Sequence, residues 1–155
     1  METAADECKL TLKDDRELLN VNLPRHVYQG QCVHTLYDAG CGLIAANFTV
    51  TGAVTSNTTA ASVNCNLTSQ AVGYFSLGTM TFTTGPNAGA SRAIKRHPSS
   101  GVLVPAFPWR YTPANGNQFT AKPGCDRLLA TCNTKFSNTA RIRIYPYIPT
   151  PEAAI

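Results

Sequence analysis

The chain has 155 residues, and only 14% of them are charged, well below the share of about a quarter that is usual in soluble domains. This length suits one domain, or one domain with part of another, and it can bury a sizeable core without any disulfide. The net charge of +4 is unevenly divided, because residues 1–50 carry four Lys/Arg against seven Asp/Glu and residues 51–155 carry nine against two. A basic half is compatible with nucleic-acid binding, but the basic side of a subunit in a larger assembly is the better interpretation.

The N-terminal segment lacks the features of a secretory signal. METAADECKL has neither the basic region nor the apolar region that signal peptides carry. The longest apolar stretches of the chain are also far too short to span a membrane. We therefore expect synthesis in a reducing cytoplasm, where the six cysteines are better explained as metal ligands than as a disulfide framework.

A run of short strands is predicted in the middle of the chain, after a short strand (8–13), a helical turn (14–21) and a long loop without sustained periodicity. Turn-forming residues separate the members of this run at regular spacing, which favours a mainly β fold, a small antiparallel β-barrel or sandwich. The predicted strands are 47–56, 61–67, 78–85, 90–97, 101–107 and 117–122. The residues expected in the core are Phe48, Val50, Val54, Met80, Phe82, Ile94, Leu103 and Phe119.

One short C-terminal helix is predicted over residues 126–136, with Asp126 as its cap. Its apolar stripe consists of Leu128, Leu129, Cys132 and Phe136. Residues 140–149 then alternate Arg outward and Ile inward, and 150–155 form an extended arm. As domains, we expect 1–25 to be the truncated end of a preceding unit, and 26–155 to be a β-rich, cluster-binding C-terminal domain with a long cysteine-bearing loop and the arm.

Four cysteines form two widely spaced pairs. Cys32 and Cys41 have eight residues between them, and Cys125 and Cys132 have six. On a continuous helix the Cα atoms of Cys125 and Cys132 would be about 10 Å apart, whereas a disulfide needs them within about 7 Å. Four thiolates are enough for a [4Fe-4S] cluster or a zinc ion, and structural zinc sites usually have shorter ligand spacings. The spacing therefore favours iron-sulfur and leaves zinc as the alternative.

The charges near the second pair weakly support a negatively charged site. Cations close in sequence would offset the charge of four thiolates around a cluster, although each of them also suits a solvated surface position. These cations are Lys122, Arg127, Lys135, Arg141 and Arg143.

The remaining cysteines and histidines carry weaker signals. We expect Cys8 and Cys65 to be free thiols in or beside strands. His34, two residues after Cys32, is a minor candidate ligand. His26 and His97 have no identifiable partner in the sequence.

Several stretches of the sequence carry a resemblance to a known family. They are LKDDRELLNVNLPRHVYQGQCVHTLYDAGCGL, GYFSLGTMTFTTGPNAGASRAIK and PGCDRLLATCNTKFSN, followed by YPYIPTPE. From about Cys8 to Ile155 the chain resembles the C-terminal part of the tail hub proteins of siphophages and gene transfer agents. Its cysteine spacings are also similar to those of lambda-like tail tip proteins.

The resemblance implies a structural protein of the virion, located in the tail tip or baseplate and made in the host cytoplasm. Hub subunits of this family close the tail tube, which implies a homotrimer. The implied partners are other tail proteins, namely the distal tail protein and the tail fibre or central tip protein, with DNA only in passage.

The resemblance also implies a ligand set and a role for a loop motif. The family's four cluster cysteines fall on Cys32, Cys41, Cys125 and Cys132, and its cluster is [4Fe-4S]. Tyr37, Asp38 and Gly40 belong to the family's LYDAGCG signature, and we expect them to shape the loop rather than to catalyse a reaction.

The chain departs from the family in two places. It has ARIRIYPYIP where members commonly have a sequence like NFRGFP, so its exit strand is expected to pack differently. Typical members also carry a long region upstream of Cys8. Its absence predicts that a ring-forming part is missing here or is supplied by another chain.

Two other function classes remain as alternatives. A secreted or periplasmic disulfide-linked β-module would fit the glycosylation sequons at Asn47, Asn57 and Asn66, which a chain rich in Asn and Thr also produces by chance. A tail-associated peptidase would use Cys32 as nucleophile and His34 as base, but neighbours two apart rarely meet in that geometry. No hydrolase or nucleotide-binding motif is present, so we expect no enzyme activity.

Overall fold

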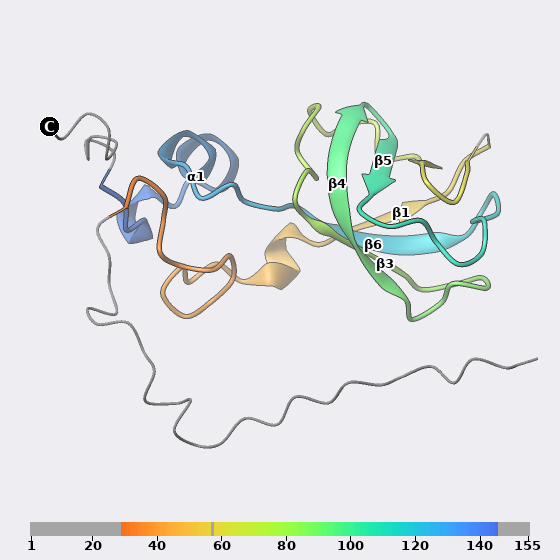
Figure 1. Ribbon diagram of the computed structural model, residues 1–155, viewed down its shortest axis with the longest axis horizontal. Helices are drawn as coiled ribbons and strands as arrows, with labels where there is room; N and C mark the ends of the chain where they lie inside the picture. Colours follow the sequence, from red (N-terminus) through yellow and green to blue (C-terminus); the bar gives the residue numbers. More distant parts are fainter. Residues whose placement is uncertain (1–28, 57, 146–155) are drawn as a thin grey trace, which may run out of the picture.

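The computed structural model describes residues 29–56 and 58–145 (Figure 1). Within these residues, six strands, one α-helix and two short 3-10 helices follow one another. In order they are η2 (Ala45–Phe48), β1 (Val50–Ala53), β2 (Val63–Asn64), β3 (Thr79–Phe82), β4 (Ser91–Ser99), β5 (Val102–Pro105), β6 (Gln118–Lys122), α1 (Leu129–Phe136) and η3 (Thr139–Arg141). Each of the six strands lies within or beside a stretch predicted as a strand, so the mainly β fold class is confirmed.

The strands form one antiparallel sheet in the order β1-β6-β3-β4-β5-β2. The sheet curls into a half-barrel, and a bridge between Val54 and Cys65 joins the ends of its two edge strands. Gly101 has φ +72° in the turn between β4 and β5, a conformation that side chains disfavour. A Cβ at this position would also meet the Cys65 carbonyl, so this glycine lets the closing edge approach the turn.

The core of the half-barrel contains six of the eight residues expected there: Val54, Met80, Phe82, Ile94, Leu103 and Phe119. Val50 is partly buried and packs against this core, as expected, whereas the partly buried Phe48 lies outside it, which corrects the prediction for Phe48. Phe48 ends η2 outside the sheet and packs edge-on against Phe136, with ring centroids 5.3 Å apart. Phe75 and Trp109 belong to the core although their segments have turn compositions.

The C-terminal helix is shorter than predicted. It begins at Leu129 instead of residue 126, because Arg127 adopts φ +65° and interrupts the helical path. Leu128 and Leu129 are 45% and 43% exposed, so only Cys132 and Phe136 of the predicted stripe are buried.

The segment after the helix keeps its alternation without forming a strand. Over residues 141–145 the Arg side chains are exposed and the Ile side chains are partly buried, as expected. The predicted elements at 8–13, 14–21 and 150–155, and the predicted sites Cys8 and His26, lie outside the described residues. The domain boundary between 25 and 26 also lies there and stays a prediction.

The chain segments on either side of the half-barrel meet at one end of it. We call residues 29–48 and 123–145 the cysteine lobe. In Figure 1 the loop at 29–43 and helix α1 lie side by side, away from β5. The hydroxyl of Tyr37 donates to the Pro123 carbonyl at 3.2 Å, which ties the first segment to the second. Among the described helices none is long and apolar enough to cross a membrane.

A four-cysteine pocket

Asp38 shapes the loop that carries Cys32 and Cys41. One oxygen of its carboxylate accepts the backbone N–H of Cys41 at 2.6 Å, and the other accepts that of Thr35 at 2.7 Å. Its carbonyl accepts the N–H of Gly42 at 2.8 Å. The hydrogen bonds to the carboxylate lower the pKa of Asp38, with that from Cys41 the largest cause. The fixed turn places Cys41 at a defined position.

The other residues of the LYDAGCG motif close the same loop. Tyr37 has φ +69° and reaches Pro123 with its hydroxyl. A Cβ at Gly40 would overlap the imidazole of His34, so only glycine allows this ring to lie against the loop backbone. Burial, followed by the charges of Tyr74, Cys41 and Cys125, raises the pKa of Tyr37 to about 12. All three motif residues therefore act on loop shape, as expected.

Cys125 lies between the last strand and the helix. Gly124 precedes it, and a Cβ there would collide with the backbone of Leu77, so the chain leaves the half-barrel through a contact that only glycine permits. Arg127 turns back through its positive φ, and its N–H donates to the Cys125 sulfur at 3.3 Å. The sulfur therefore faces the start of α1 from outside the helix.

Cys132 lies on the buried side of α1 and is joined to Asn138. The Cys132 carbonyl accepts the N–H of Asn138 at 3.1 Å, and the Cys132 thiol donates to the Asn138 carbonyl at 3.4 Å. The Asn138 side chain then reaches the loop, donating to the Cys41 carbonyl at 2.8 Å and lying 3.7 Å from the Cys41 sulfur. Asn138 thus links one cysteine of each pair.

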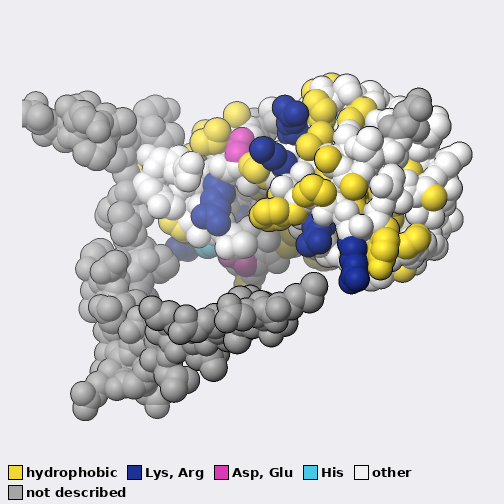
Figure 2. All heavy atoms as spheres, turned by 45° about the vertical axis from the view of Figure 1, so that its right-hand side comes forward, with side chains coloured by type: hydrophobic (Ala, Val, Ile, Leu, Met, Phe, Trp, Pro, Cys, Tyr) yellow, Lys and Arg dark blue, Asp and Glu magenta, His cyan; other side chains and the backbone are white. Residues whose placement is uncertain are grey.

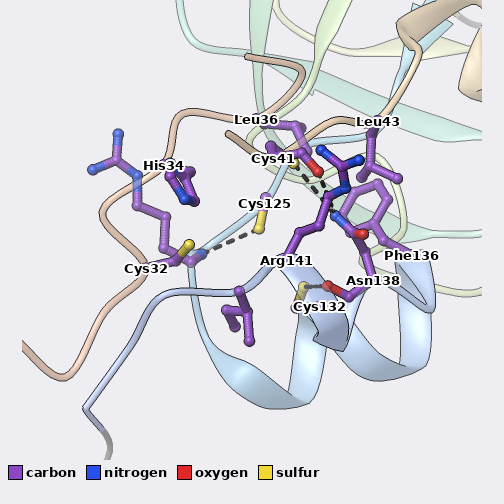
Figure 3. Close-up of a pocket in the computed structure, with 12 residues that line it drawn as sticks. Cys32, His34, Leu36, Cys41, Leu43, Cys125, Cys132, Phe136, Asn138 and Arg141 are labelled. Carbon is purple, nitrogen blue, oxygen red and sulfur yellow. Dashed lines mark hydrogen bonds between the residues drawn. The ribbon is translucent and has the colours of Figure 1, made fainter. Parts of the chain in front are cut away.

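Cys32, Cys41, Cys125 and Cys132, the cysteine quartet, line one pocket (Figure 3). The two pairs have 83 residues between them in the sequence, and the backbone N–H of Cys32 donates to the Arg127 carbonyl at 2.9 Å. Apolar side chains supply much of the remaining wall: Leu36, Leu43, Phe136 and Ile142. The structure therefore brings together all four cysteines that the sequence singled out.

The electrostatics of the pocket disfavour free thiolates. Burial raises the pKa of Cys125 and of Cys132, and each is raised further by charge on the other members of the quartet. All described cysteines are free thiols. If all four sulfurs were thiolates, a cation among them would offset their mutual repulsion.

The described donors do not form a site for a single metal ion. No cluster of three or more His, Cys, Asp or Glu side chains in the described part of the chain is arranged to hold one metal ion. A [4Fe-4S] cluster binds each thiolate to a different iron, so its sulfur ligands are more widely separated than those of zinc. Arg127 and Arg141 also line the pocket, where they can offset the negative charge of a cluster.

The other residues singled out by the sequence lie beside the pocket or outside it. His34 lines the pocket beside the quartet, whereas Cys65 is a buried thiol of the half-barrel core. Lys135 donates to the Gly124 carbonyl at 2.7 Å and lies over the Tyr74 ring, so it joins α1 to the half-barrel.

The sequence did not point to Asn138, because an Asn after a helix is commonly only part of a turn.

Comparison with known proteins assigns the chain to a protein family. A family model described as "Phage conserved hypothetical protein BR0599" matches residues 73–152, which is more than half of the chain. The chain belongs to this phage family. A second model, described as "Baseplate hub protein, N-terminal attachment domain", matches residues 1–44, which include Cys32 and Cys41. The tail hub resemblance is consistent with both. No curated protein matches the chain.

A solved structure has a fold similar to that of this protein. A chain from the "Virion of native gene transfer agent (GTA) particle" superposes with a TM-score of 0.69 at 21% sequence identity. The match covers 89% of this protein and 49% of that chain, so the protein spans about half the length of its structural neighbour. The phage family and this fold together support a structural role in a virion.

Proposed function

We propose that the protein is a structural component of the tail hub of a phage-like particle, and that the cysteine quartet holds a [4Fe-4S] cluster. The observation that carries the proposal is the convergence of four free thiols, from two segments far apart in sequence, on one pocket with apolar walls. The cluster would join the loop at 29–43 to helix α1. The virion location rests on the phage family, the hub attachment domain match and the fold of the gene transfer agent chain.

The role proposed for the cluster is structural. The cysteine lobe has little secondary structure, since α1 has eight residues, η2 four and η3 three. Because the pocket exists only in the folded chain, the free energy of binding a cluster adds to the free energy of folding. The sulfur donors would supply the cluster's ligands, while the Arg127 and Asn138 N–H groups would hydrogen-bond to Cys125 and Cys41.

A zinc ion in the same quartet is the second candidate. Four thiolates are a common structural zinc site, but zinc requires all four around one centre, which the described side chains do not offer as arranged. As an assembly partner set we propose neighbouring tail proteins, including further copies of this chain as a homotrimer, the distal tail protein and the fibre or central tip protein.

Spectroscopy of protein purified without oxygen tests the cofactor. We expect a brown protein with a broad absorption band in the visible region, which bleaches on reduction and then gives an electron paramagnetic resonance signal. A colourless protein that contains stoichiometric zinc would favour the second candidate. A metal-free protein with disulfides within the quartet would contradict both.

A further inference from the structure

The connection between β5 and β6 exposes large aromatic side chains. We call residues 106–111 the aromatic loop. The side chain of Phe107 is 70% exposed and that of Tyr111 is 48% exposed, and Arg110 between them is also exposed. Aromatic and Arg side chains are the types that contribute most to protein interfaces, and exposure in water is unfavourable for the apolar rings.

The aromatic loop is held rigidly by the half-barrel. Trp109 is 3% exposed and packs edge-on against Phe82, with ring centroids 4.6 Å apart. The backbone N–H of Trp109 donates to the Ala60 carbonyl at 2.9 Å. The buried side chain of Asn87 pairs with the backbone of Tyr111, donating at 2.7 Å and accepting at 3.3 Å. A loop fixed in this way loses little conformational entropy when it binds a partner.

The surroundings of the aromatic loop carry cations without anions. Residues 45–123 include five Lys/Arg and no Asp or Glu. Arg92 lies over the Trp109 ring and Arg110 over the Tyr111 ring, at 5.9 and 5.3 Å from the ring centroids. Figure 2 shows dark blue side chains among yellow ones on the half-barrel. The described acidic residues, Asp38 and Asp126, both belong to the cysteine lobe. The complementary partner is therefore acidic.

The acidic residues that match this surface are in the chain itself. Of its nine Asp and Glu, only Asp38 and Asp126 belong to the described residues. Six of the others fall within residues 1–28, which also carry four Lys/Arg and so have a net charge of −2. We propose that the aromatic loop and the cations around it dock a second copy of this chain through its acidic segment 1–28. Such a contact joins different surfaces of two copies, so it repeats from copy to copy and can close a ring.

Sedimentation velocity of the full chain at increasing concentration and salt tests this docking. We expect the protein to self-associate at low salt and to dissociate as salt screens the charges. Phe107→Ser and Arg110→Glu should each weaken association by about tenfold or more, as interface anchor residues do. Val72→Ser is the matched control, because Val72 is 64% exposed and lies outside the aromatic loop. It should associate like the wild type.

The outcomes distinguish a second copy of the chain from other occupants of the aromatic loop. A wild type that stays monomeric at every concentration and salt overturns the proposal. If, in addition, Phe107→Ser unfolds at a lower midpoint than the wild type, segment 1–28 lies on the aromatic loop of its own copy, which also overturns the proposal. Binding of a labelled single-stranded oligonucleotide by monomeric protein, lost in Phe107→Ser, identifies nucleic acid instead. Equal association of Phe107→Ser and Val72→Ser also overturns it. None of these results depends on the cluster.

Discussion

The side-chain amide of Asn138 donates a hydrogen bond to the carbonyl oxygen of Cys41 at 2.8 Å, across 97 positions of sequence. The same nitrogen lies 3.7 Å from the Cys41 sulfur, and the backbone of Asn138 is bonded to Cys132. One residue therefore fixes the separation of two thiols that belong to different segments. Outer groups of this kind commonly set how tightly a metal site holds its metal.

Asn138→Asp should weaken the proposed cluster site without removing a ligand. The substitution keeps the shape of the side chain but replaces the N–H donor with a charged oxygen beside the Cys41 sulfur. We expect cluster loss to an iron chelator to become about 10–100-fold faster, as for other second-layer substitutions. Asn133→Asp on the exposed side of α1 is the control. Equal rates for the two variants would show that Asn138 has no such role.

Cys125→Ser should lose the cluster and loosen the loop at 29–43. The amide of Cys32, which is bonded to the Arg127 carbonyl, should exchange with solvent faster in this variant. Cys65→Ser is the matched thiol substitution, because Cys65 is 4% exposed in the half-barrel core and does not line the pocket. It should retain iron despite a modest loss of stability. If Cys65→Ser loses iron as readily as Cys125→Ser, the choice of ligands is wrong.

Gly124→Ala should destabilise the junction between the half-barrel and the cysteine lobe. The added methyl group would meet the backbone of Leu77 and Gly78, which cannot move without disturbing the entry to β3. We expect a loss of about 1–3 kcal/mol or more in the free energy of unfolding, measured with urea. Gly30→Ala has open space around its Cβ and should change stability by less than about 0.5 kcal/mol. Similar midpoints for the two variants would contradict the close contact.

His97 should make the half-barrel less stable in acid. Its side chain is 1% exposed, and neither ring nitrogen has a hydrogen-bond partner of good geometry among the described residues. Burial lowers the pKa of His97; the nearby Ala71 carbonyl opposes this shift, and the charge of Lys135 adds to it. The unfolded chain therefore binds the proton more readily. Its contribution to stability is complete above the unfolded pKa of about 6.5 and is lost as the pH falls towards the folded pKa.

Urea unfolding of the wild type and of His97→Gln, at about pH 7.5 and about pH 5, measures this effect. The glutamine variant lacks the titrating group, so its midpoint should fall less between the two pH values than that of the wild type. The difference between the two proteins isolates His97 from carboxylates that titrate in the same range. An identical fall in both would mean that His97 does not couple protonation to folding.

The strands were predictable because their signals are local. In β3 the buried Met80 and Phe82 alternate with the less buried Thr79 and Thr81, and β6 repeats the pattern around Phe119, so period-two alternation located the sheet. Phe75 and Trp109 could not be located in this way. They enter the core from connections whose composition is that of turns, and only the closed path of the chain brings them inward.

The cysteine lobe was harder to predict because its geometry depends on single residues. The positive φ of Arg127, a residue type that rarely adopts it, delays the helix and leaves Leu128 and Leu129 exposed. Nothing in the sequence around residue 127 indicates this turn. The spacing and resemblance identified the quartet, but the bridge through Asn138 joins residues too distant in sequence for any periodic pattern to reveal.

The number of iron and sulfide ions per chain, measured on the full-length protein purified without oxygen, tests the central claim most directly. A [4Fe-4S] cluster in the cysteine quartet predicts about four of each per chain, and almost none in Cys132→Ser. Iron well below this value in protein that was never exposed to air, or the same iron content in Cys132→Ser, would contradict the account.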